Sequence, residues 1–175
     1  MSFGDVLAGR TIVVVDDHEG MRELLYDALS SAGARVLRAT NAFDALAMVR
    51  ENAVDALVSD LRMPAMNGLD LARAIRELRA TDKSSIVAIA VSGDDSWKFV
   101  DPNRAAVAGF DYHMMKPVEP ELLVSTVHEL IRRRARSASG TLPRVGAPPV
   151  HGVPPVHGAP PVHGAPPVRG ARRKR

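Results

Sequence analysis

The sequence contains near its N-terminus the stretch Thr11-Ile12-Val13-Val14-Val15-Asp16-Asp17, an apolar run that ends in two carboxylates. Three further apolar runs are each followed at once by a polar residue: Ala56–Ser59 by Asp60, Ile86–Val91 by Ser92, and Phe110–Met115 by Lys116. Short apolar runs separated by helix-period segments are typical of buried strands in a parallel sheet. Ligand sites of such sheets lie outside the carboxyl ends of the strands, so we expect these polar residues to converge.

The segments between the runs carry helix signals. Predicted helices cover roughly Glu19–Ala32, which Gly33 ends; a segment capped by Thr40 or Asn41 that runs to Asn52; Leu69–Ala80; and Glu119–Arg134. A fifth strand is predicted at Arg35–Ala39. The alternation predicts an α/β fold of the (βα)5 type, a doubly wound five-stranded parallel sheet with helices on both faces.

One segment departs from this regularity, between Ser92 and Gly109. Asp101 and Pro102 form a good helix start, which predicts a loop followed by a short helix over Pro102–Ala108. The alternative is a single helix from Asp94 that is kinked at Pro102.

Composition excludes several classes of function. The chain has 175 residues and no cysteine, which excludes disulfides, zinc–thiolate sites and thiol catalysis. It has no run of 18 apolar residues, and Met1–Arg10 lacks the apolar stretch of a signal peptide. We therefore expect a soluble, cytoplasmic protein with no membrane association.

The charge is divided along the chain. Residues 1–131 carry 20 acidic and 13 basic residues, whereas residues 132–175 carry 10 basic and no acidic residues. Residues 146–169 repeat Gly-Ala-Pro-Pro-Val-His with small variations, and paired prolines exclude both helix and central strand. We predict a folded domain over residues 1–136 and a disordered, basic Pro/Gly/His-rich tail over residues 137–175.

The chemistry of the converging residues indicates a metal ion and an anion. Three carboxylates, those of Asp16, Asp17 and Asp60, repel one another unless a cation lies among them, and hard oxygen ligands suit Mg²⁺. The ammonium of Lys116 and the hydroxyl of Ser92 suit a phosphoryl group. The alternative role for Asp16 is to cap the following helix.

Four motifs in this order carry a family resemblance: Val13-Val14-Val15-Asp16-Asp17; Ser59-Asp60-Leu61-Arg62-Met63-Pro64 with Gly68 eight residues after Asp60; Val91-Ser92-Gly93; and Met115-Lys116-Pro117. With these motifs the first ~134 residues resemble a response-regulator receiver domain of two-component signalling, which has a flavodoxin-like fold. The resemblance implies a stand-alone receiver of the chemotaxis-regulator type.

The resemblance also implies the role of each residue. Asp60 would be the phosphoacceptor, and Asp16, Asp17, Asp60 and the backbone carbonyl of Arg62 would hold Mg²⁺, Asp16 through a water molecule. Lys116 would bind a phosphoryl oxygen, and Ser92 would switch towards another. The peptide bond before Pro117 is often cis in such domains. Arg62 and Asp94 would tune the lifetime of the aspartyl phosphate.

One position departs from the family pattern. Receivers usually carry Tyr or Phe three residues before the lysine, as a second switch residue, and here that residue is His113. An imidazole adds polarity and, from its ordinary pKa, a charge that changes near neutral pH.

Function and partners follow from the resemblance. We expect the chain to take a phosphoryl group from a sensor histidine kinase or a histidine phosphotransfer protein, to hydrolyse its own aspartyl phosphate, and to signal by binding a downstream protein. It would not be an enzyme in any other sense. The 41 residues after Arg134 show no periodic apolar spacing, so no DNA-binding output domain is expected.

The tail leaves three interpretations open. Its basic residues favour weak nucleic-acid association in which the receiver regulates a basic arm. It lacks aromatic residues for base stacking, and a solvated spacer is the simpler interpretation. His151, His157 and His163 are six residues apart and suit loose binding of Ni²⁺ or Zn²⁺.

Overall fold

A computed structural model describes residues 4–78, 86–93 and 109–138. Its strands are β1 (Thr11–Val15), β2 (Arg35–Ala39), β3 (Ala56–Asp60), β4 (Val87–Ser92) and β5 (Tyr112–Met115). Its helices are α1 (Glu19–Ser31), α2 (Ala42–Glu51), α3 (Gly68–Leu78) and α6 (Pro120–Ala138). All five strands are parallel and lie in the order β2-β1-β3-β4-β5.

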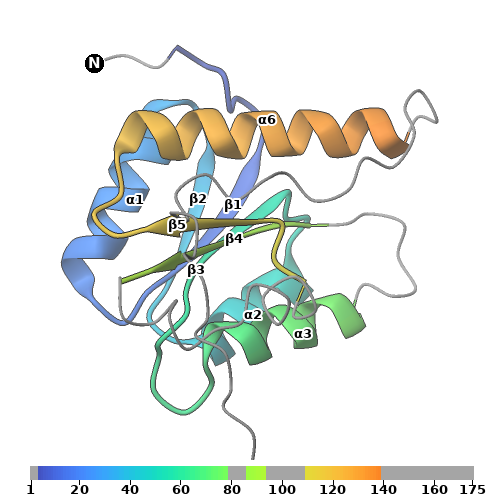
Figure 1. Ribbon diagram of the computed structural model, residues 1–175. Helices are drawn as coiled ribbons and strands as arrows, with labels where there is room; N and C mark the ends of the chain where they lie inside the picture. The colour runs from blue at the N-terminus through green and yellow to red at the C-terminus, as the bar shows by residue number, and fades with distance from the viewer. Residues whose placement is uncertain (1–3, 79–85, 94–108, 139–175) are drawn as a thin grey trace, which may run out of the picture.

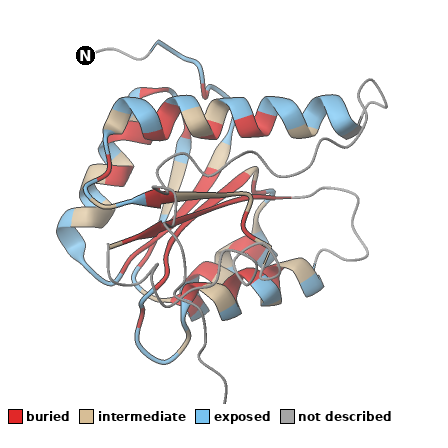
Figure 2. Ribbon diagram, in the orientation of Figure 1, coloured by how far each residue is buried: buried red, intermediate tan, exposed pale blue. Residues whose placement is uncertain are grey.

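Helices cover both faces of the sheet, with α1 and α6 on one face and α2 and α3 on the other (Figure 1). Side chains alternate between these layers because successive residues of a strand point to opposite faces. In β1, Ile12 and Val14 pack with α1 and α6, whereas Val13 and Val15 pack with α2 and α3. The central strands are therefore buried on both faces (Figure 2), as their continuous apolar runs predict.

The expected elements that lie within the described residues are confirmed, with differences at their ends. Asn41 caps α2 by accepting a hydrogen bond from the backbone N–H of Asp44, and Gly33 follows α1 with a positive φ of 88°. The expected strands end at Ser59 and Val91, whereas β3 and β4 include the next residue, Asp60 or Ser92. β5 begins at Tyr112 rather than Phe110.

The end expected for the last helix, at Arg134, is wrong. α6 continues to Ala138, because the arginines and alanines there favour a helix and no glycine or proline follows Pro120 before Gly140. The expected helix over Pro102–Ala108 and most of the tail lie outside the described residues, and so do Arg79 and Ala80. None of the described helices is long and apolar enough to cross a membrane.

An ion-pair network ties the helices to the amino-terminal edge of the sheet. Arg76 of α3 donates to the carbonyl of Ile86 (2.7 Å), to that of Gly109 (3.0 Å) and to the carboxylate of Asp111 (3.0 Å). Asp111 also accepts hydrogen bonds from the backbone N–H of Ala88 and from Arg134 of α6. The carboxylate of Asp111, the residue before β5, therefore joins α3, α6 and β4.

Candidate functional site

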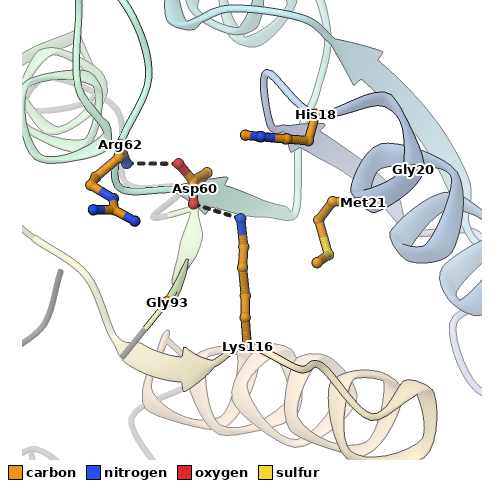
Figure 3. Close-up of a pocket in the computed structure, with 7 residues that line it drawn as sticks. All are labelled: His18, Gly20, Met21, Asp60, Arg62, Gly93 and Lys116. Carbon is orange, nitrogen blue, oxygen red and sulfur yellow. Dashed lines mark hydrogen bonds and ion pairs between the residues drawn. The ribbon is translucent and has the colours of Figure 1, made fainter. Parts of the chain in front are cut away.

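Asp60 lies at the carboxyl end of β3, the central strand of the sheet, and its residue is only 5% exposed. One carboxylate oxygen, Oδ1, is 2.8 Å from the ammonium of Lys116, and the other, Oδ2, accepts a hydrogen bond from the backbone N–H of Arg62 at 2.7 Å. Figure 3 shows both interactions. The carboxylate is thus held in one orientation, with its oxygens facing a cation and a backbone donor.

Asp16 and Lys116 complete the inner part of the site. Asp16 follows β1, is fully buried, and its Oδ2 is 2.9 Å from the Lys116 ammonium. Burial by itself lowers the pKa of Lys116, but hydrogen bonds and charge attraction from Asp16 and Asp60 outweigh it and raise the pKa above its usual value. The lysine therefore stays charged and neutralises two buried carboxylates. The peptide bond to Pro117 is cis.

Asp16 is not the cap of α1. The N-cap residue is His18, and the second oxygen of Asp16 accepts a hydrogen bond from the backbone N–H of His18 at 2.9 Å, in the turn before the helix. The guanidinium of Arg22 donates to the backbone carbonyls of Asp16 (2.9 Å) and Asp17 (3.1 Å). These bonds fix the turn that carries both carboxylates.

The outer part of the site contains Asp17 and His18. The Asp17 side chain is 30% exposed, and its Oδ1 is 2.9 Å from Nδ1 of the His18 ring. His18 was not expected in the site, although its place directly after two acids at a strand end is a signal that could have identified it. Arg22 was also missed, because a bond from a helix to the preceding turn leaves no periodic pattern.

Gly68 sets the shape of the loop after β3. A Cβ atom at this position would lie 2.3 Å from the carbonyl oxygen of Asp60 and 3.1 Å from Cα of Leu61. The start of α3 therefore packs directly against the backbone of Asp60. Only glycine permits this approach, which explains why a glycine stands eight residues after Asp60.

Ser92 lies fully buried at the end of β4, and its hydroxyl oxygen is 2.6 Å from Nε2 of His113. Burial lowers the pKa of His113 to about 4. The expectation of a charge change near neutral pH is therefore wrong for this conformation, because removing the ring from water disfavours its charged form. A neutral ring can accept the serine hydrogen bond.

A pocket of about 480 Å³ opens beside Asp60 and Lys116. Its lining residues come from the carboxyl ends of β3, β4 and β5 and from the start of α1: His18, Gly20, Met21, Asp60, Arg62, Gly93 and Lys116. Of the expected residues, Asp16, Asp60 and Lys116 come together, and Asp17 lies beside them. Ser92 belongs to the same edge, but its hydroxyl faces His113.

The donor chemistry of this edge fits a divalent metal ion. One donor atom from each of Asp16, Asp17 and His18 lies within 4.8 Å of the other two. Carboxylate oxygens are the ligands that Mg²⁺ prefers, and Asp60 adds a further carboxylate across the pocket (Figure 3).

Comparison with known proteins identifies relatives of this chain. The chain is 29% identical over 140 residues to the phosphate regulon transcriptional regulatory protein PhoB of Pseudomonas aeruginosa, over 80% of this chain and 59% of that protein. It is 32% identical over 141 residues to the virulence sensor protein BvgS of Bordetella bronchiseptica, over 80% of this chain but 11% of that protein. The chain thus spans less than two thirds of these relatives.

A solved structure of full-length FixJ from B. japonicum has a TM-score of 0.64 at 26% identity, with 75% of this chain and 62% of that chain covered. The sequence profile of the response regulator receiver domain matches residues 12–128, a range that contains every site residue described above. This chain therefore belongs to the response regulator receiver domain family of two-component signalling.

Proposed function

We propose that the chain is a phosphoacceptor response regulator in which Asp60 receives a phosphoryl group from a sensor histidine kinase or a histidine phosphotransfer protein. The observation that carries this proposal is the setting of Asp60. Its buried carboxylate faces the pocket, with the Lys116 ammonium at 2.8 Å. A carboxylate is a competent nucleophile when the charge of the incoming phosphate is neutralised.

In the proposed step a carboxylate oxygen of Asp60 attacks the phosphorus of a phosphohistidine. The O–P bond forms, the N–P bond breaks, and the leaving imidazole takes up a proton. Lys116 binds a phosphoryl oxygen through its ammonium, which already lies beside the attacking carboxylate. The same residues then support hydrolysis of the aspartyl phosphate, with Arg62 at the rim of the pocket and Asp94, outside the described residues, tuning its rate.

Asp16, Asp17, Asp60 and the carbonyl of Arg62 would hold Mg²⁺, with Asp16 acting through water. When bound, the ion neutralises charge on the transferring phosphoryl group. What supports this assignment is the gathering of carboxylates at one edge of the sheet, with Lys116 neutralising only part of their charge.

We propose that the phosphorylated form signals through a downstream protein in the cytoplasm, with Ser92 and His113 as the residues that respond to phosphorylation. Regulated binding of nucleic acid by the basic tail remains a prediction, because residues 139–175 lie outside the described part of the chain. The same holds for the domain boundary at residue 136 and for metal binding by the tail histidines.

The test is phosphorylation of the full chain by acetyl phosphate with Mg²⁺, followed by intact mass. We expect one base-labile phosphoryl adduct on the wild type and none on Asp60→Asn. Asp70→Asn is the matched control, since Asp70 is an exposed aspartate in the first turn of α3, and it should retain the adduct. An undiminished adduct on Asp60→Asn would show that Asp60 is not the phosphoacceptor.

A further inference from the structure

The ring of His18 is turned towards the acidic pair rather than towards the helix that it precedes. His18 is the N-cap residue of α1, but its side chain makes no capping hydrogen bond. Its Nδ1 instead lies 2.9 Å from Oδ1 of Asp17 and 3.6 Å from Oδ1 of Asp16. The side chain is 79% exposed, so contact with the two carboxylates, rather than core packing, sets its orientation.

The spacing of the three donor atoms suits a single ion. All three lie within 4.8 Å of one another. Ligand bonds of ~2.1 Å separate neighbouring ligands of a six-coordinate ion by ~3.0 Å. Nδ1 of His18 lies 2.9 Å from Oδ1 of Asp17, so these two donors already have the spacing of neighbouring ligands, while Asp16 acts through water. The guanidinium of Arg22 donates hydrogen bonds to the backbone carbonyls of Asp16 and Asp17 and so fixes the turn that carries them. This limits how far the turn has to rearrange when an ion binds.

The ring of His18 can present a nitrogen lone pair to an ion at this site without a change of its own charge. A neutral imidazole carries its proton on either nitrogen, and the tautomer with the proton on Nε2 leaves Nδ1 free to coordinate. The contact between Nδ1 of His18 and the Asp17 carboxylate would then be replaced by an ion that both groups coordinate. Figure 3 shows the ring reaching over the pocket on the side opposite Arg62.

From this arrangement we propose that His18 is a nitrogen ligand of the metal site and gives that site a preference for a divalent transition-metal ion over Mg²⁺. The inference rests on the proposed function, because it concerns the same carboxylates. Imidazole nitrogen binds first-row transition ions well, whereas Mg²⁺ selects oxygen. Removal of the ring should therefore weaken the transition-metal complex and leave Mg²⁺ binding almost unchanged.

The experiment is calorimetric titration of the full chain with Co²⁺ and with Mg²⁺ at one fixed pH. All proteins carry His151→Ala, His157→Ala and His163→Ala, so that the tail histidines do not bind Co²⁺. We expect His18→Ala to lower Co²⁺ affinity by ~10-fold or more and Mg²⁺ affinity by less than ~twofold. The visible absorption of bound Co²⁺ should also change in this variant.

Two further variants identify the cause of any effect. Glu19→Gln removes an exposed carboxylate next to His18 that is not one of the three donors, and both affinities should stay unchanged. Asp17→Asn removes a shared ligand, and both affinities should fall. Together, these variants distinguish a loss of affinity caused by removing a metal ligand from one caused by changing the net charge of the turn.

The possible results distinguish the inference from the proposed function. Equal losses for Co²⁺ and Mg²⁺ in His18→Ala, or no loss of Co²⁺ affinity, would overturn the role of His18 and leave the Mg²⁺ site intact. If Asp17→Asn changes neither affinity, the metal site of the proposed function is wrong, and the inference fails with it. A selective Co²⁺ loss in His18→Ala supports the inference whether or not Asp60 accepts phosphate.

Discussion

The hydroxyl group of Ser92 and the ring of His113 form a 2.6 Å hydrogen bond between β4 and β5. Ser92 pairs in register with Met115, and Ala90 pairs with His113, so Ser92 and His113 lie on the same face of the sheet, two residues apart in register. In the proposed function Ser92 turns towards a phosphoryl group on Asp60, and its bond to His113 competes with that movement when the hydroxyl is the donor. His113 thereby fixes the orientation of the Ser92 hydroxyl in the structure.

A first prediction concerns pH. The pKa of His113 is lowered from its usual 6.5 to about 4 in the folded protein, so between these values the unfolded chain binds a proton that the folded chain does not. The free energy of unfolding should therefore fall as pH is lowered from ~6.5 to ~4. In His113→Gln, which does not titrate, this decline should be shallower. Urea unfolding at several pH values measures it, and parallel curves for the two proteins would contradict the buried, neutral ring.

A second prediction concerns Lys116, whose ammonium neutralises Asp16 and Asp60. Lys116→Met should bind Mg²⁺ more tightly, by on the order of tenfold, because the ion no longer competes with a resident cation. Without Mg²⁺ the variant should be less stable than the wild type, because two buried carboxylates lose their partner. Calorimetric titration and thermal unfolding measure the two effects.

Arg73→Met is the matched control for this change, since it removes one positive charge from an exposed pair with Asp70 on α3. Its Mg²⁺ affinity should stay close to that of the wild type. If both variants gain affinity equally, the effect is one of net charge and does not arise from the contacts of Lys116.

A third prediction concerns Gly68. In Gly68→Ala the new methyl group would overlap the carbonyl of Asp60, so the loop or α3 has to move. We expect a loss of ~1–3 kcal/mol in the free energy of unfolding and slower phosphorylation of Asp60. Gly20→Ala meets no atom within 4 Å, and its stability should be unchanged or higher by up to ~1 kcal/mol. Equal stabilities of the two variants would show that the loop adapts without cost.

A fourth prediction concerns Asp111. Its removal in Asp111→Ala leaves Arg76 and Arg134, both about a quarter exposed, without their shared carboxylate. We expect a loss of ~2–3 kcal/mol by urea unfolding, with Mg²⁺ binding unchanged. Glu23→Ala, which breaks the exposed pair between Glu23 and Arg38, should cost less than ~1 kcal/mol. Similar losses in the two variants would mean that Asp111 acts as an ordinary surface charge.

The sequence predicts the sheet and the convergence of its polar residues well, because both follow from local patterns. The apolar run before Asp16 marks a strand by itself, and parallel pairing then brings Asp60 and Lys116 to the same edge. Contacts that depend on three-dimensional placement could not be predicted. The bond between Ser92 and His113 joins residues 21 positions apart, and its effect on the pKa of His113 comes from burial.

Arg134 shows the same limit. In the sequence it belongs to a run of arginines beside a basic tail, so its local context indicates an exposed helix end. In the structure it pairs with Asp111, 23 residues away, and α6 continues past it for another turn. A long-range ion pair of this kind leaves no periodic pattern in the sequence, because it joins a single residue of α6 to a single residue outside any helix.

The ion-pair network of Asp111 occupies the edge of the sheet opposite to the edge that carries Asp60. The contacts of Asp111 are therefore separated by the length of the strands from the carboxylates that we propose to bind an ion. Substitutions at the two edges should combine additively, since distant sites seldom couple. Stability can therefore be adjusted through Asp111 at one end of the strands without a change in the surroundings of Asp60 at the other.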